Sequence, residues 1–213
     1  GRDGAHGSDG VDALGRAHLA LHEDEQAQER LSRAQEAGLD TPELHYALGL
    51  ALGRRYERAI AIARRGGDPK WVERKTKELE DRYLRPALAS MERSRAVRLE
   101  APSYLDGLMA FYRKDYDAAL RLAERAHGEA PWLYEAKKLQ ADVHLARGIE
   151  RKDRGDIEAG AHDLEEAERL FDEAADVGRS DATLYEGSAE ARSRHMELDG
   201  DRAVAMRWGR VHG

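Results

Sequence analysis

The chain has 213 residues, of which 41% are hydrophobic and 36% are charged, a composition that excludes an intrinsically disordered tail. Its net charge of −7, with acidic and basic residues interleaved, argues against a nucleic-acid-binding protein, and no apolar run approaches the roughly 20 residues of a membrane span. It contains no cysteine, which excludes disulfides and thiolate metal sites and fits the reducing cytoplasm.

Residues 1–10 combine Gly, Asp and His without an apolar segment, so they are predicted to form a flexible lead-in rather than a signal peptide. The first residue is Gly rather than Met, which suggests an excised fragment or a processed product. From residue 11 onward, apolar residues recur three or four positions apart, as in Leu44, Leu48 and Leu52, and strand-favouring Val, Ile and Thr are sparse. The sequence therefore predicts one all-α domain over residues 11–213.

Clusters of Gly, Pro, Ser and Asp divide the predicted helices at residues 38–42, 66–69, 101–103 and 178–181. In several of these clusters a Pro stands where the first turn of a helix tolerates it. We therefore expect a helix to end before each cluster and another to begin after it.

An internal repeat is the most informative pattern in the chain. A glycine is followed by a tyrosine, by three alanines at three- and four-residue spacing and by a proline; these positions are Gly107, Tyr116, Ala119, Ala123, Ala126 and Pro131. This pattern resembles a tetratricopeptide (TPR) unit, a helix–turn–helix of about 34 residues with small residues where the two helices cross. The same register fits Gly15, Ala27, Leu31 and Ala34.

The resemblance implies an α-solenoid of antiparallel helix pairs, with another solenoid or an irregular bundle as the alternative. A further copy is expected to begin at Leu48-Gly49 and to resume at Tyr56 and Ala59 after a shortened turn. An inserted segment over about 66–98 would follow it, with one helix from Lys70 to about Arg82 and another over 85–98.

The C-terminal part departs from the standard repeat. Helices over about 133–152 and 155–174 are each predicted to be about seven residues too long, which is close to two helical turns. Residues 182–198 and 201–211 are predicted to form a terminal pair. Trp208 and Val211 lie in its last helix, where they would serve self-association or docking of a neighbouring domain.

Catalytic motifs are not found. His18 and His22 are four residues apart on one predicted helix, but no third ligand or intervening Glu accompanies them, so a metal site is not expected. Residues 66–70 lack the spacing of a phosphate-binding loop. The sequence therefore predicts a non-enzymatic protein without cofactor or metal.

A solenoid of helix pairs exposes a concave groove lined by its first helices, and a peptide is its natural ligand. The candidate groove residues are Arg16, Tyr46, Leu50, Tyr104, Leu108, Phe111, Tyr112, Lys138 and Asp142. The aromatic residues would alternatively fill the core. The chain has no Asn, and the aligned positions are Arg16, Leu50, Leu108 and Asp142, so it lacks the carboxylate clamp of chaperone-binding TPR domains.

The function predicted from these patterns is that of a scaffold that binds a protein or peptide. One alternative is a regulatory segment of a larger bacterial signalling protein, because residues 81–88 and 130–136 are similar to helical repeat regions that follow bacterial Ser/Thr kinase domains. The excess of Arg over Lys also suggests a GC-rich bacterial source. A second alternative is a metal-dependent helical enzyme built around His18 and His22.

Overall fold

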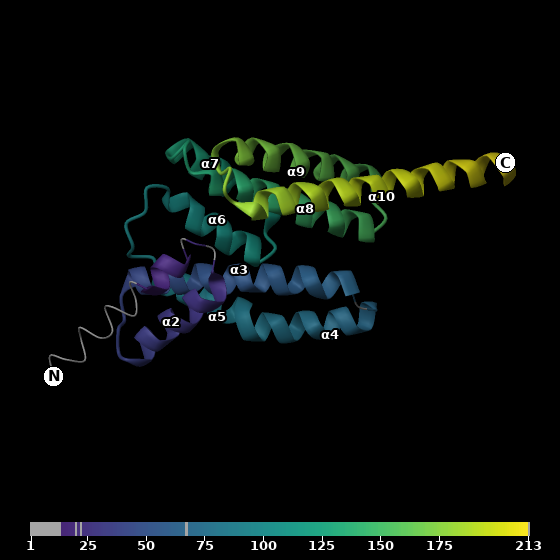
Figure 1. The fold of residues 1–213 in the computed structure, drawn as a ribbon. Coiled ribbons are helices and arrows are strands. Elements are labelled where there is room, and N and C mark those ends of the chain that lie inside the picture. The colour runs from purple at the N-terminus through teal and green to yellow at the C-terminus, as the bar shows by residue number, and fades with distance from the viewer. Residues whose placement is uncertain (1–13, 20, 22, 67, 213) are drawn as a thin grey trace. The chain divides into compact units, whose positions relative to one another are not determined.

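The computed structural model describes residues 14–212 except 20, 22 and 67, and it places the side chains of these residues except Pro69 and residues 201–212. Over the described residues the chain is all-α, as predicted, with no strand (Figure 1). A helical stretch over 14–19 comes first. The helices that follow are α2 (Asp24–Glu36), α3 (Pro42–Gly66), α4 (Pro69–Leu79), the π-helical turn η1 (Glu80–Leu84), α5 (Arg85–Arg93), α6 (Pro102–Tyr112), α7 (Tyr116–Glu129), α8 (Tyr134–Asp153), α9 (Ile157–Val177) and α10 (Ala182–His212).

The four predicted breaks are confirmed, because each lies between two helices. Pro42, Pro69 and Pro102 each occupy the first position of a helix, where the missing N–H of proline costs no hydrogen bond. At the second break, the side chain of Asp68 accepts hydrogen bonds from the backbone N–H groups of Lys70 and Trp71 and so caps α4.

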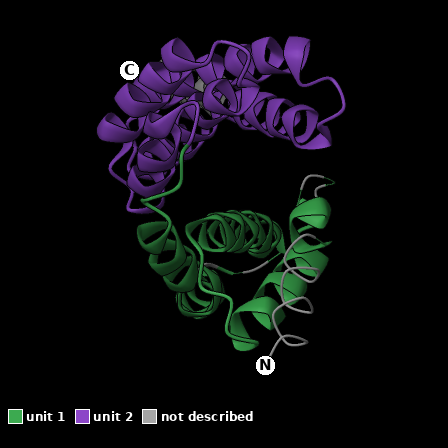
Figure 2. Ribbon diagram, turned by 90° about the vertical axis from the view of Figure 1, so that its left-hand side faces the viewer, with its two compact units in different colours: residues 1–98 green, residues 99–213 purple. Residues whose placement is uncertain are grey.

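The helices group into two compact units, residues 1–98 and residues 99–213 (Figure 2). We refer to them as unit 1 and unit 2. In unit 1, α3 packs against α2, α4, η1 and α5. In unit 2, neighbouring helices pack in chain order, and the alternate helices α6, α8 and α10 also contact one another in sequence, α6 with α8 and α8 with α10.

Unit 1 corrects the predicted second repeat. The expected turn between Gly49 and Tyr56 does not exist, because α3 runs through both residues without interruption. A Cβ atom on Gly49 would lie 2.8 Å from Cγ of Met91 and 3.3 Å from the carbonyl oxygen of Ala87. The small residue therefore admits α5, so the helix that crosses α3 at Gly49 comes from the segment that the sequence suggested was an insertion.

The helix predicted from Lys70 is present and begins at Pro69, but the break expected between Arg82 and Arg85 is not. The chain stays helical from Pro69 to Arg93, and the turn before Pro86 widens into η1, in which Arg85 N–H bonds to the carbonyl oxygen of Glu80. Proline lacks an N–H and its ring clashes with the carbonyl four residues earlier in a regular α-helix. The wider π-helical turn lets the helix continue past Pro86.

Unit 2 contains the best-matching repeat. Ala119, Ala123 and Ala126 are fully buried on α7, as expected for residues at a helix crossing. A Cβ atom on Gly107 would lie 3.4 Å from the backbone nitrogen of Ala123 and 3.1 Å from Cδ2 of Leu139 on α8. The small residues of this repeat therefore let α6 approach both α7 and α8.

The predicted lengthening of the next pair is confirmed, since α8 has 20 residues and α9 has 21. The two helices cross at glycines: a Cβ atom on Gly148 would lie 3.1 Å from the carbonyl oxygen of Gly160, and a Cβ atom on Gly160 would lie 3.1 Å from that of Gly148. Farther along the pair, Ala141, Ala167 and Phe171 belong to one buried cluster. The added turns thus extend the interface between α8 and α9.

The predicted terminal pair is wrong, because α10 is a single helix of 31 residues that continues past Gly200 and beyond the ends of α8 and α9 (Figure 1). A glycine inside a helix costs only about 1 kcal/mol relative to alanine, and no proline accompanies Gly200 to stop the helix. The lead-in over 1–10 and the side chains of Trp208 and Val211 lie outside the described residues. Among the helices as described, none has the length and apolar character to cross a bilayer.

Candidate functional site

The candidate groove residues of α6 differ in how much surface they offer. Tyr104 and Phe111 are half-buried, whereas Leu108 and Tyr112 are only 6% and 7% exposed. Leu108 and Tyr112 therefore belong to the interior of unit 2 in this structure. Of the four side chains, Tyr104 and Phe111 retain surface for a ligand.

The two candidates on α8 are bonded to each other. Nζ of Lys138 donates to Oδ2 of Asp142 at 2.7 Å, and the two side chains are 18% and 21% exposed. Because the residues are four positions apart, they lie on the same face of α8. This partly covered ion pair belongs to a helix that packs directly against α6.

The remaining three candidates lie in unit 1. Arg16 is exposed, and Tyr46 and Leu50 are half-buried on α3. A groove that joins these residues to those of α6 and α8 stays a prediction.

An aromatic cluster lies at the C-terminal end of α6. The ring centroid of Phe111 is 5.7 Å from that of Tyr112 and 6.4 Å from that of Tyr116, which opens α7. The hydroxyl of Tyr116 donates to Oε1 of Glu150 on α8 at 2.8 Å. Tyr116 therefore connects the aromatic cluster to α8.

Beside Tyr116 lies a polar hollow of about 280 Å³, which the sequence did not indicate. It is lined by the turn between α6 and α7 and by the C-terminal half of α8, namely by Lys114, Asp115, Tyr116, Asp117, Arg147, Glu150, Arg151 and Arg154. Lys114 holds the turn in the left-handed conformation with φ of 60°. Charged side chains thus make up most of the wall of this hollow.

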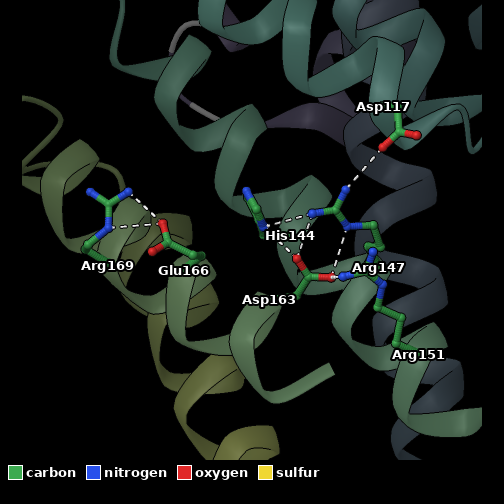
Figure 3. A network of polar contacts seen from close by, with 7 residues as sticks. All are labelled: Asp117, His144, Arg147, Arg151, Asp163, Glu166 and Arg169. Atoms are coloured by element: carbon green, nitrogen blue, oxygen red, sulfur yellow. Dashed lines mark hydrogen bonds and ion pairs between the residues drawn. The ribbon is translucent and has the colours of Figure 1, made fainter. Parts of the chain in front are cut away.

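Next to this hollow, a fully buried carboxylate binds three side chains of α8 (Figure 3). Asp163 of α9 accepts hydrogen bonds from Nδ1 of His144 at 2.9 Å, from Nε and Nη2 of Arg147 at 2.9 and 2.7 Å, and from Nη1 of Arg151 at 2.8 Å. Arg147 also reaches Asp117 of α7 at 3.3 Å through Nη1. The network therefore joins α7, α8 and α9.

These contacts decide the pKa of Asp163. Burial by itself would raise the pKa, but the hydrogen bonds from His144 and Arg147 and the positive charges of Arg147 and Arg151 outweigh burial and lower the pKa from 3.8 to about 2. Asp163 is therefore ionised throughout the neutral range. Each oxygen accepts two hydrogen bonds, so its bonding capacity is largely used inside the protein.

We expect the lowered pKa to make the protein sensitive to acid. A carboxyl whose pKa is lower in the folded state stabilises the protein above its unfolded pKa, and that stabilisation is lost as the pH falls through the folded value. For Asp163 the loss falls between about pH 4 and pH 2 and amounts to roughly 2 kcal/mol. Urea midpoints measured across this range should fall more steeply for the parent than for Asp163→Ala; parallel curves would contradict the expectation.

The network and the groove candidates occupy opposite sides of α8. Arg147 follows Lys138, and Arg151 follows Asp142, by about two and a half turns of the helix. The side that carries Arg147 and Arg151 faces Asp163, so Lys138 and Asp142 point the other way. On α8, the ion pair of Lys138 and Asp142 and the polar hollow therefore lie on different faces.

The sequence contained one signal for the buried network. Asp163 stands four, seven and eleven residues before Ala167, Leu170 and Ala174, which are all buried. An acidic residue in the apolar stripe of a helix needs a cationic partner, and Arg147 and Arg151 follow His144 at three- and four-residue spacing on the preceding helix. His162 and Asp163 are adjacent, but His162 is exposed.

The pair considered for a metal site is only partly described. Nδ1 of His18 lies 2.5 Å from Oε2 of Glu23, and His22 lies outside the described residues. In the part of the chain that the structure describes, no group of three or more His, Asp or Glu side chains is arranged to hold a metal ion. His18 therefore has its carboxylate partner five residues along the chain.

Comparison with known proteins adds two solved structures. A thermophilic TPR protein of Thermus thermophilus, TTC0263, is 19% identical over 86% of this chain and 98% of its own, with a TM-score of 0.45. The MamA RS-1 ArsTM double mutant is 18% identical over 92% of this chain and 96% of its own, with a TM-score of 0.31. No protein-family model and no curated protein sequence matches the chain.

Proposed function

We propose that unit 2 is a polypeptide-binding module and that its ligand lies across α6 and α8. The observation that supports this proposal is the surface formed by half-exposed Tyr104 and Phe111 on α6 and by the ion pair of Lys138 and Asp142 on α8. Helices α6, α8 and α10 contact one another in sequence, so they form a row of first helices, as the resemblance to TPR proteins implies. A peptide segment is the ligand that such a row accommodates.

The residue types suit this role. An aromatic ring offers a large contact area and loses little side-chain entropy when it is covered, because it has only two side-chain torsions. The ion pair supplies one charge of each sign at a fixed place, which selects the register of a charged ligand more than it strengthens binding. Regulation of a kinase domain remains a prediction from sequence similarity.

A peptide-display selection against the immobilised chain tests the proposal. Affinities of the selected peptides are then measured by calorimetry for the parent and for Tyr104→Ala/Phe111→Ala. We expect the double variant to bind at least about tenfold more weakly, a loss of about 1.4 kcal/mol, because the main contact area has been removed.

The matched control is Trp132→Ala/Tyr185→Ala, which removes two aromatic side chains of unit 2 that are 63% and 53% exposed. Circular dichroism must show that both variants remain helical. The proposal predicts that the control keeps the parental affinity. Equal losses in the two variants, or no loss in either, would place the binding surface elsewhere.

A further inference from the structure

The hairpin formed by α3 and α4 in unit 1 is strongly basic in an acidic protein. Residues 58–77 contain seven Arg and Lys and only two Asp and Glu, whereas the whole chain has a net charge of −7. Three of the seven cations, Lys70, Arg74 and Lys77, follow one another at four- and three-residue spacing and so lie along one face of α4. We call these three residues the basic stripe.

The basic stripe has no counter-charge in contact with it among the described residues. Its three side chains are exposed, and among the described residues none of them forms an ion pair. Cations elsewhere often do, for example Arg125 with Glu129, Lys137 with Glu173 and Lys152 with Glu197. The basic stripe therefore offers charge to a partner outside unit 1.

Helix α9 in unit 2 presents a surface of the opposite sign. Its solvent face carries Glu165, Asp172 and Asp176 together with Arg169, and all four residues are exposed. Their spacing of four, three and four residues keeps them on one side of the helix. We call these four residues the acidic stripe.

Two cations of the basic stripe match two carboxylates of the acidic stripe when the helices run antiparallel. With Lys70 opposite Asp172, Glu73 is opposite Arg169 and Lys77 is opposite Glu165, because the steps on both helices are three and then four residues. Glu73 lies beside the basic stripe and Arg169 lies within the acidic stripe, so this register also brings these two opposite charges together. A parallel arrangement with Lys70 opposite Glu165 would instead place Arg74 against Arg169.

From this complementarity we propose that α4 of one molecule docks antiparallel on α9 of a second copy of the chain. Pairs between exposed charges are individually weak and are screened by salt, so the association is weak and depends on ionic strength. The contact uses none of the residues assigned to peptide binding, so it is independent of the proposed function. Because each chain carries both stripes, a contact between copies leaves further stripes available for additional molecules.

Glu73 beside the basic stripe and Arg169 within the acidic stripe favour a protein partner over a phosphate-rich one. A nucleic acid or an anionic lipid surface presents negative charge only, and it would repel Glu73 within the basic surface. In the antiparallel register Glu73 lies opposite Arg169, which also pairs with Glu166 and Glu173 of its own helix. A second copy of the chain thus offers carboxylates to the cations of the basic stripe and a cation to Glu73.

Sedimentation velocity of the full chain at about 50 mM and about 500 mM salt tests the proposal. We expect association that rises with protein concentration at low salt and weakens at least about tenfold at high salt. Lys70→Glu/Lys77→Glu and Glu165→Lys/Asp172→Lys should each remain monomeric, because each variant carries two stripes of like charge. An equimolar mixture of the two should associate again, because the reversed charges then meet.

The control is Arg121→Glu/Arg179→Glu, which changes the net charge by the same amount as the α4 variant but lies outside both stripes. It should associate like the parent. A parent chain that is monomeric at low salt, including one whose stripes pair within the same molecule, would overturn the proposal. So would a mixture that fails to associate, or a control that loses association as completely as the α4 variant.

Discussion

Replacement of Asp163 by alanine should destabilise the protein by about 3 kcal/mol, the largest effect that we expect from a single substitution in unit 2. The change removes the shared acceptor of His144, Arg147 and Arg151, so that Arg151 loses its counter-charge and Arg147 keeps only the exposed Asp117. Since Arg147 and Arg151 are 18% and 35% exposed, water relieves part of the penalty. The expected loss therefore lies at the lower end of the range for a broken buried ion pair.

Equilibrium urea unfolding, followed by circular dichroism, measures this loss. Glu165→Ala is the matched control, because it removes an acidic side chain from the same helix at an exposed position. We expect the control to change the free energy of unfolding by less than about 0.5 kcal/mol. A loss below about 1 kcal/mol for Asp163→Ala would show that the network contributes little net stability.

The second large effect is expected at the glycine crossing of α8 and α9. A methyl group added by Gly148→Ala would lie 3.0 Å from Cγ of Leu164 and 3.1 Å from the carbonyl oxygen of Gly160. Because one of these neighbours is backbone, the helices must move apart, and we expect a destabilisation of about 1–3 kcal/mol. Thermal and urea unfolding should both report it.

Gly128→Ala is the comparison variant, and we expect it to change the free energy of unfolding in the opposite direction. Gly128 lies in the last turn of α7, and a Cβ atom there would meet nothing within 4 Å. The substitution should stabilise the protein by about 0.5 kcal/mol, because alanine loses less backbone entropy in a helix than glycine does. If the two substitutions shift stability in the same direction, close helix approach at Gly148 is not the reason.

The helical class and most helix boundaries could be predicted because they depend on local signals. Proline at the first position of α3, α4 and α6 and the three- to four-residue apolar spacing were sufficient. The pairing of helices depends on distant contacts, and in unit 1 the predicted pairing failed. Gly49 signals a close helix approach, but nothing in its neighbourhood shows that the partner is Met91 of α5 rather than the segment at Tyr56.

Pro86 shows why a correct local rule can give a wrong boundary. Proline disfavours a regular α-helix, so the sequence predicts that one helix ends and another begins before it. The structure keeps the helix and changes its hydrogen-bond pattern instead, through η1. Packing of Tyr83, Ala87 and Met91 in the interior of unit 1 favours the continuous helix, and this packing is not visible locally.

For the candidate site, the helices could be predicted from the sequence. The exposed fraction of each side chain on them could not. Tyr104 and Phe111 keep surface on α6, while Leu108 and Tyr112 are covered. A resemblance to a repeat suggests which helix faces a groove, whereas burial depends on the neighbours that pack on it. The network at Asp163 was missed because acidic residues on helices are usually solvated, and its partners become apparent only when α8 and α9 are paired.

The uninterrupted helix α10 has a mechanical consequence. Its 31 residues extend about 46 Å, against about 32 Å for the 21 residues of α9. Such a rod transmits rotation, since adding or deleting one residue between Ala182 and Gly200 turns everything beyond that point by about 100° and shifts it by about 1.5 Å. The length of α10 thus sets the angular orientation of its far end, and single-residue insertions would change that orientation in steps while leaving the rest of the helix sequence intact.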